Sequence, residues 1–175
     1  MFKPINTILF STNLLENCLS ALEASVSMAT QYRATLVLLH VIEREIPGHT
    51  GEYFKGLLGE EKWQAINEQH EKEARQALVG KMSSEKVGKS VLRQYCTEAG
   101  IDLAKCDFDW KELVVKDNNI AGAILNQSGE TNSDIIVMGA KKGFLGRNSM
   151  GSKIKEVMRE SEIPVLVVPP GAKKQ

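Results

Sequence analysis

Five short apolar runs along the chain are separated by segments whose apolar residues recur at helical spacing. The runs span residues 5–12, 35–42, 110–116, 134–138 and 164–168. The first two are apolar almost throughout, which is typical of strands buried on both faces of a parallel sheet. Strands that alternate with helices predict an open, doubly wound α/β sheet with right-handed crossovers.

The segments between the runs predict the helices. Helical spacing predicts helices over about 15–32, 60–79, 83–100, 120–128 and 151–160, and Gly80 is expected to end the second of them. Asn13 and Glu16 have the spacing of a reciprocal cap at the first helix, and Asn119 is expected to cap the fourth. The glycine- and proline-rich stretch 43–59 predicts a loop with room for a short helix.

A glycine-rich loop follows the fourth run and leads into the last helix. It carries glycines at 139, 143, 146 and 151, and Ser152 follows the last of them. A strand, a glycine-rich loop and a helix start together bring backbone N–H groups and the positive end of a helix dipole toward a phosphate. The loop is neither a Walker A motif nor G-x-G-x-x-G. A surface loop whose glycines only turn the chain is the alternative.

The ends of the first and fourth runs are the expected place for a ligand. Ligands of doubly wound sheets bind beyond the carboxyl ends of the strands, where the strand order reverses. The first run ends at Thr12 and Asn13, and the fourth ends at Met138 and Gly139. If these two strands are neighbours, all four residues share one crevice with the glycine-rich loop.

Composition narrows the class of protein. The 175 residues fit one domain, and 42% hydrophobic with 25% charged residues is typical of a globular protein. A net charge of zero argues against a nucleic-acid partner. The chain shows no signal-peptide layout and no apolar run long enough to span a bilayer, so we expect a cytoplasmic protein without membrane contact.

The cysteines and histidines indicate no catalytic or metal site. Cys18, Cys96 and Cys106 are odd in number and lack metal-ligand spacing, so we expect inert thiols in a reducing compartment. A redox pair of Cys96 with Cys106 is the alternative. His40 lies in the second run and is expected to be a core or crevice residue rather than a catalyst. No pair of nucleophile and base is recognisable, so no catalytic residue is assigned.

The sequence resembles the universal stress protein family over nearly its whole length. Residues 8–13 (ILFSTN) resemble the family's I-L-V-P-T-D strand, and residues 38–42 (LLHVI) match its second strand. The most specific match is Met138-Gly139 and Gly151-Ser152 followed by residues 163–168 (IPVLVV). The resemblance implies one domain over 1–175, Rossmann-like, with sheet order 3-2-1-4-5, an added helical segment at 80–109 and a tail at 171–175. It also implies homodimers joined through the fifth strand, Val165–Val168, and, in one branch, binding of ATP, AMP or a related nucleotide, with room for Mg²⁺.

The resemblance implies the nucleotide-binding residues position by position. Val41 would offer backbone groups to adenine, and Gly139 would approach the ribose. The last glycines and the helix start would surround the phosphates, over a floor made by the end of the first strand. The full implied set is Ser11, Thr12, Asn13, Val41, Met138, Gly139, Lys142, Gly143, Gly151, Ser152 and Lys153. Lys141, Lys142 and Arg147 either neutralise phosphates or are solvated.

Two departures from the family pattern bear on this assignment. The loop reads G-x3-G-x7-G-S, whereas the binding branch has G-x2-G-x9-G-[S/T], so Gly143 either represents the phosphate-side glycine or that glycine is displaced. Asn13 stands where the binding branch has an aspartate, so one acceptor remains but the charge that could hold a metal or a ribose hydroxyl is lost. Asn13 and Ser152 could also serve only as helix caps, worth roughly 1 kcal/mol.

Three functions therefore remain open from the sequence. The first is a dimeric stress-response regulator that binds an adenine nucleotide. The second is a nucleotide-free dimeric interaction module of the same family, acting on an unknown protein partner. The third is an adenine-nucleotide hydrolase on a similar sheet, for which the sequence offers no acid, base or metal cluster at the strand ends.

Overall fold

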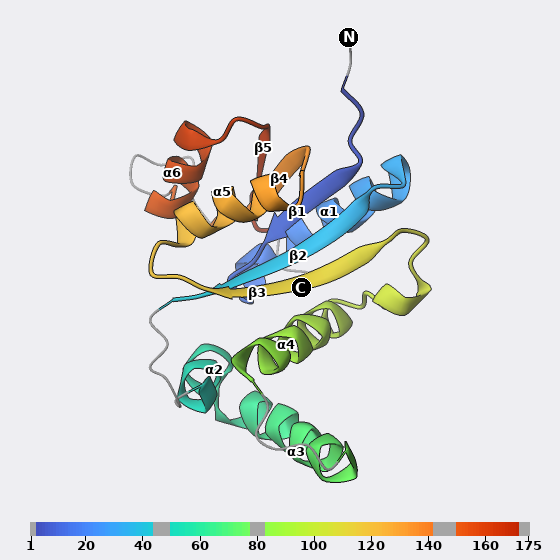
Figure 1. The fold of residues 1–175 in the computed structure, drawn as a ribbon, viewed down its shortest axis with the longest axis vertical. Helices are drawn as coiled ribbons and strands as arrows, with labels where there is room; N and C mark the ends of the chain where they lie inside the picture. Colours follow the sequence, from blue (N-terminus) through green and yellow to red (C-terminus); the bar gives the residue numbers. More distant parts are fainter. Residues whose placement is uncertain (1–2, 44–49, 78–82, 142–149, 172–175) are drawn as a thin grey trace.

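A five-stranded parallel sheet forms the centre of the molecule (Figure 1). The computed structural model describes residues 3–43, 50–77, 83–141 and 150–171, without the side chains of 50, 70 and 73–77. The strands are β1 (Thr7–Ser11), β2 (Thr35–Ile42), β3 (Trp110–Lys116), β4 (Ile135–Gly139) and β5 (Val165–Val168). Their order is β3-β2-β1-β4-β5, with every pair parallel. The strand positions and the order 3-2-1-4-5 are therefore confirmed.

Helices cover both faces of the sheet. One face packs against α1 (Leu19–Tyr32) and α4 (Ser84–Glu98), and the other packs against α5 (Ile120–Glu130) and α6 (Ser152–Glu160). Figure 1 shows α4 on one side of the strands and α5 with α6 on the other. Successive residues of β1 point to opposite faces, so Phe10 packs toward α1 and α4, and Leu9 packs toward α5 and α6.

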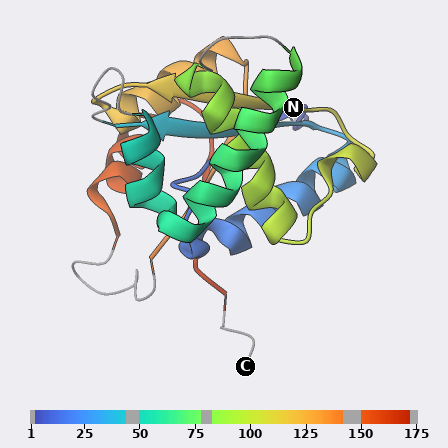
Figure 2. The ribbon, with the colours of Figure 1, turned by 90° about the horizontal axis from the view of Figure 1, so that it is seen from below.

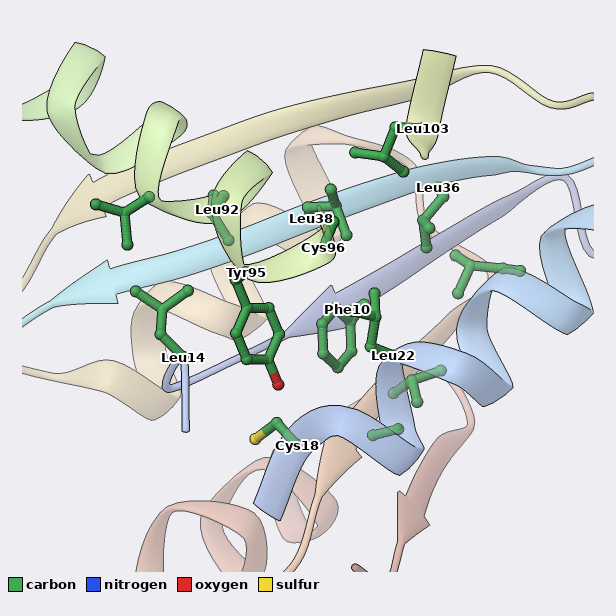
Figure 3. Packing of buried hydrophobic residues seen from close by; sticks show 14 of the residues in the cluster. Phe10, Leu14, Cys18, Leu22, Leu36, Leu38, Leu92, Tyr95, Cys96 and Leu103 are labelled. Carbon is green, nitrogen blue, oxygen red and sulfur yellow. The ribbon is translucent and has the colours of Figure 1, made fainter. Parts of the chain in front are cut away.

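The core beneath α1 and α4 is a cluster of buried side chains (Figure 3). Phe10, Leu22, Leu38 and Leu92 come from four different elements, and none of them is exposed to solvent. Tyr95 of α4 reaches across this core, where its hydroxyl donates a hydrogen bond of 3.1 Å to the carbonyl oxygen of Leu15. Because Leu92 and Tyr95 lie in the core, the helix in the 80–109 segment is part of the packed domain.

Two further helices follow β2 and lie outside the two layers. They are α2 (Thr50–Leu58), in the stretch predicted as a loop with a possible helix, and α3 (Glu60–Ala77). Gly59, with φ of +88°, makes the turn between them in a conformation that favours glycine. Phe54 of α2 is fully buried and stacks on Trp63 of α3, with ring centroids 6.0 Å apart. Figures 1 and 2 show α4 between α3 and the sheet. Gly80, the predicted end of the helix that corresponds to α3, lies outside the described residues.

The predicted reciprocal cap between Asn13 and Glu16 is wrong. The Oδ1 atom of Asn13 instead accepts a hydrogen bond of 3.0 Å from the backbone N–H of Leu15, two residues on. Leu14 has a φ of +64°, and the chain enters a 3-10 turn, η1 (Glu16–Cys18), before α1 begins. The helix therefore starts too late for Asn13 to reach its free N–H groups. The cap by Asn119 is confirmed, because its Oδ1 atom accepts from the N–H of Gly122 at 3.0 Å.

The three cysteines are free thiols. Cys18 and Cys96 are buried, and burial raises the pKa of Cys96 to about 12. Burial also raises the pKa of the Cys106 thiol, so the protonated thiol is favoured at both positions. Within the described ranges, no helix combines the length and apolar character needed to cross a bilayer.

Candidate functional site

One cavity of about 540 Å³ lies at the carboxyl ends of β1, β2 and β4. It gathers nine of the eleven residues that the resemblance implies; the other two, Lys142 and Gly143, lie outside the described residues, as does Arg147. The nine are Ser11, Thr12, Asn13, Val41, Met138, Gly139, Gly151, Ser152 and Lys153. Lys141 also lines the cavity. Four stretches far apart in the sequence thus meet at one place.

Thr12 organises the floor of the cavity. Its backbone N–H donates to the carbonyl oxygen of Leu39 at 2.9 Å, which extends the pairing of β1 with β2. Its hydroxyl oxygen accepts from the backbone N–H of Leu14 at 2.9 Å and so fixes the turn after β1. Only 5% of Thr12 is exposed, so all these partners are shielded from water.

His40 joins the floor to α2. Its Nδ1 atom lies 2.9 Å from the carbonyl oxygen of Thr12, and its Nε2 atom lies 3.0 Å from the hydroxyl oxygen of Tyr53. A carbonyl oxygen can only accept, so Nδ1 carries the hydrogen, and neutral Nε2 accepts from the Tyr53 hydroxyl. Burial lowers the pKa of His40, and the hydrogen bond to the Thr12 carbonyl raises it by less, so the neutral imidazole is favoured. His40 is thus a buried cross-link at the crevice.

Gly139 is required by the packing of the floor. A Cβ atom at this position would lie 2.8 Å from the Cα of Cys18 and 2.9 Å from the carbonyl oxygen of Asn17. Cys18 lies in the same wall, where its thiol donates to Oδ1 of Asn13 at 3.1 Å. Burial raises the pKa of Cys18, so the thiol keeps its proton. The end of β4 therefore packs directly against the turn that starts α1.

The rim on the opposite side is the start of α6. Gly151 is the residue before the helix, with φ of −53° and ψ of 146°, and a Cβ atom there would meet no atom of the described residues within 4 Å. The first backbone N–H groups of a helix have no partner within the helix, so those of α6 border the cavity as donors. Lys153 lies in this first turn, and its Nζ atom is 3.0 Å from Oε2 of Glu43, just after β2.

An apolar wall completes the cavity. Val41, Met138, Ile120 and Ile124 come from the sheet and α5, and Tyr53 with Leu57 comes from α2. The sequence did not point to the two α2 residues, because they lie within a glycine- and proline-rich stretch and their only signal is a separation of four residues. It did not point to Asn17 and Cys18 as site residues either, because no motif marks them.

The geometry suits a ligand with a flat apolar part and an anionic part. Apolar side chains with a few convergent polar groups are typical of small-molecule sites, and a helix start favours an anion. In the described part of the chain, no three histidine, cysteine or acidic side chains are placed to hold a metal ion.

Comparison with known proteins places the chain among proteins of similar fold. A universal stress protein from Lactobacillus plantarum has a TM-score of 0.60 and 17% identity, over 95% of this chain and 99% of that one. A universal stress protein in complex with cAMP has a TM-score of 0.58 and 17% identity, over 97% of this chain and all of that one. A family member from Burkholderia pseudomallei has a TM-score of 0.53 and 17% identity, over 97% of this chain and 99% of that one.

The match at the level of the family is more specific. No curated protein sequence is close enough to this chain to match it. The family model for the universal stress protein family, however, matches residues 4–169, which include every strand and helix described above. This chain therefore belongs to the universal stress protein family.

Proposed function

We propose that this protein binds an adenine nucleotide in the cavity at the ends of β1, β2 and β4, and acts as a dimeric regulator in a cytoplasmic stress response. The observation that carries the proposal is the convergence of nine implied site residues on one cavity of about 540 Å³. The structural neighbour in complex with cAMP supports an adenine nucleotide as the class of ligand.

The two ends of the cavity suit the two ends of a nucleotide. The base would lie against the apolar wall beside Val41 and Tyr53, within reach of the β2 backbone. The phosphate would lie at the start of α6, where the N–H groups of Ser152 and Lys153 can donate to it. Ser11 and Thr12 would lie beneath, and Mg²⁺, where it accompanies the nucleotide, would be held by phosphate oxygens.

The test is to detect the nucleotide and then to remove its phosphate contacts. Mass spectrometry of the denatured protein should find a co-purified adenine nucleotide, and calorimetry should show that ATP and AMP bind. Gly151→Val should weaken binding about a hundredfold or more, because the valine side chain would fill the space of the phosphate and so prevent two hydrogen bonds to a charged group, each worth about 1.5–3 kcal/mol. Ser152→Ala should cost less, because the backbone N–H survives.

The fold of both variants provides the control. Among the described residues, none has an atom within 4 Å of a Cβ atom placed at position 151, so the circular dichroism spectrum of Gly151→Val should match that of the wild type. Absence of wild-type binding at millimolar nucleotide would refute the proposed function. Equal binding by folded Gly151→Val and wild type would instead place the nucleotide elsewhere.

A nucleotide-free interaction module is the second candidate. It is favoured by the polar groups of the cavity that already have partners in the chain, since Asn13 accepts from Leu15 and Cys18, and Lys153 pairs with Glu43. Recovery of stoichiometric nucleotide from the purified protein would exclude this candidate.

The proposed dimer would form through β5. This strand is at the edge of the sheet, and its four residues, Val165–Val168, are apolar and only partly buried. Exposed apolar edges promote association, and two such edges paired about a two-fold axis would cover each other. Light scattering at micromolar concentration should give twice the monomer mass, whereas a monomer would contradict the proposal.

A further inference from the structure

Charged side chains are few in the described lining of the cavity. Only Glu43, Lys141 and Lys153 carry a charge among the described residues that border it, because His40 is held neutral by burial. Glu43 is therefore the one carboxylate in this part of the lining. Its position matters because the same cavity is proposed to hold phosphate groups.

Glu43 forms an ion pair with Lys153, which lies in the first turn of α6. The Nζ atom of Lys153 lies 3.0 Å from Oε2 of Glu43, across a separation of 110 residues in the sequence. The side chains are 33% exposed at Glu43 and 46% exposed at Lys153, so the pair is only partly screened by water. The ion pair links the end of β2 to the first turn of α6, and both residues border the cavity.

This ion pair sets a charge-dependent cost for phosphate at the helix start. A phosphate that takes Lys153 as its partner must displace the Glu43 carboxylate or lie close to it. The repulsion grows with the charge of the ligand, and one phosphate group already carries about −1.5 to −2 at pH 7. A triphosphate carries more negative charge than a monophosphate, so it meets the larger electrostatic cost.

The floor supplies no second carboxylate that would offset this cost through a bound cation. The position after Thr12 is the neutral Asn13, whose Oδ1 atom accepts from the N–H of Leu15 at 3.0 Å and from the thiol of Cys18 at 3.1 Å. A Mg²⁺ ion that accompanied a triphosphate would find its preferred carboxylate ligand in this lining only at Glu43, which is paired with Lys153.

We infer that Glu43 is a specificity-determining residue, which through its ion pair with Lys153 makes the cavity favour an adenine nucleotide with one phosphate group over a triphosphate. The inference rests on the proposed function, because it concerns which adenine nucleotide the cavity takes. In this role Glu43 weakens the binding of phosphate groups. A residue that only oriented Lys153 toward phosphate would strengthen that binding.

The test compares Glu43→Gln with a matched removal of charge elsewhere. Glu98 of α4 pairs with Lys62 at 2.9 Å, with side chains 39% and 58% exposed, and neither residue borders the cavity. Glu98→Gln therefore changes the net charge by the same amount and breaks a similar ion pair. Calorimetry is run on wild type and both variants with adenosine, AMP and ATP, at low and high salt, with and without Mg²⁺.

Wild type should bind AMP more tightly than ATP. Glu43→Gln should raise the affinity for ATP about tenfold and that for AMP about threefold, and should leave adenosine unchanged within about twofold. The gains should shrink at high salt, because the pair is partly exposed. Glu98→Gln should change all three affinities by less than about twofold.

The outcomes separate this inference from the proposed function. Tighter ATP than AMP binding by wild type, an equal gain for both ligands in Glu43→Gln, or the same gain in Glu98→Gln would overturn the role of Glu43 alone. Weaker binding of AMP and ATP by Glu43→Gln would show that Glu43 orients Lys153, and would also overturn it. Absence of adenine-nucleotide binding in wild type and in Glu43→Gln would overturn both. Glu43→Ala provides a second variant should Glu43→Gln fold poorly.

Discussion

Gly139 and Gly151 border the same cavity, but the packing of the described residues requires a glycine only at Gly139. At Gly139 a side chain would collide with the backbone of Asn17 and Cys18. At Gly151 a Cβ atom would meet no atom of the described part of the chain within 4 Å, and the backbone angles are accessible to any residue. The family resemblance treats both glycines alike, although only one of them is fixed by the fold.

The same contrast separates the whole floor from the whole rim. The floor residues Thr12, His40 and Gly139 hold β1, β2, β4 and α2 together through buried contacts. The rim residues Gly151, Ser152 and Lys153 are partly or fully exposed and leave their backbone donors to the cavity. Changes to the floor should therefore cost stability, whereas changes to the rim should affect ligand binding alone.

The variants Gly139→Ala and Gly151→Ala should show the largest difference in stability between the floor and the rim. Gly139→Ala should lower the free energy of unfolding by about 3 kcal/mol, at the upper end for overpacking, because the clash is with backbone atoms. Gly151→Ala should leave it unchanged or raise it by up to about 1 kcal/mol, because alanine restricts the unfolded chain. Urea denaturation measures both, and equal effects at the two positions would show that floor and rim do not differ.

Thr12→Val should have the next largest effect. Valine has nearly the shape of threonine but cannot accept from the buried N–H of Leu14, so we expect a loss of about 1–2 kcal/mol in the free energy of unfolding. Thr12→Ser keeps the acceptor and should cost less, about 0.8 kcal/mol for the lost methyl group. The rim counterpart Ser152→Ala should stay within about 0.5 kcal/mol. A valine variant as stable as the serine variant would remove Thr12 from the framework of the floor.

The pH dependence of stability gives the smallest effect. Burial lowers the pKa of His40 below its ordinary 6.5, so between the lowered value and 6.5 the unfolded chain binds a proton that the folded chain does not. The free energy of unfolding should therefore be at its full value above pH 6.5 and fall as the pH drops below it, by at most about 1.4 kcal/mol per pH unit. His40→Gln should flatten this slope in urea denaturation at pH 5.5–7.5, and an unchanged slope would assign it to other groups.

The sequence predicts the framework well because the hydrophobic side chains that form the pattern are also the ones that the sheet buries. All five strands coincide with the runs read from the sequence, and the order of β1 and β4 follows from the resemblance, so the crevice at Thr12 and Gly139 was predictable. The cap at Asn13 was wrong because the left-handed Leu14 has no signature in the sequence. The wall formed by Tyr53 and the pair formed by Glu43 with Lys153 depend on contacts between distant residues, which no local pattern encodes.

The central place of β1 has a consequence for how the protein matures on the ribosome. β1 pairs with β2 through Thr7 and Thr35 on one side, and with β4 through Ile8 and Ile135 on the other. The backbone N–H of Thr7 also donates a hydrogen bond to the carboxylate of Asp134, which is synthesised 127 residues later. One edge of this buried strand therefore stays uncovered while most of the chain is synthesised, and such edges promote aggregation. The nascent chain should need a chaperone until β4 emerges, and only then can the ligand cavity exist.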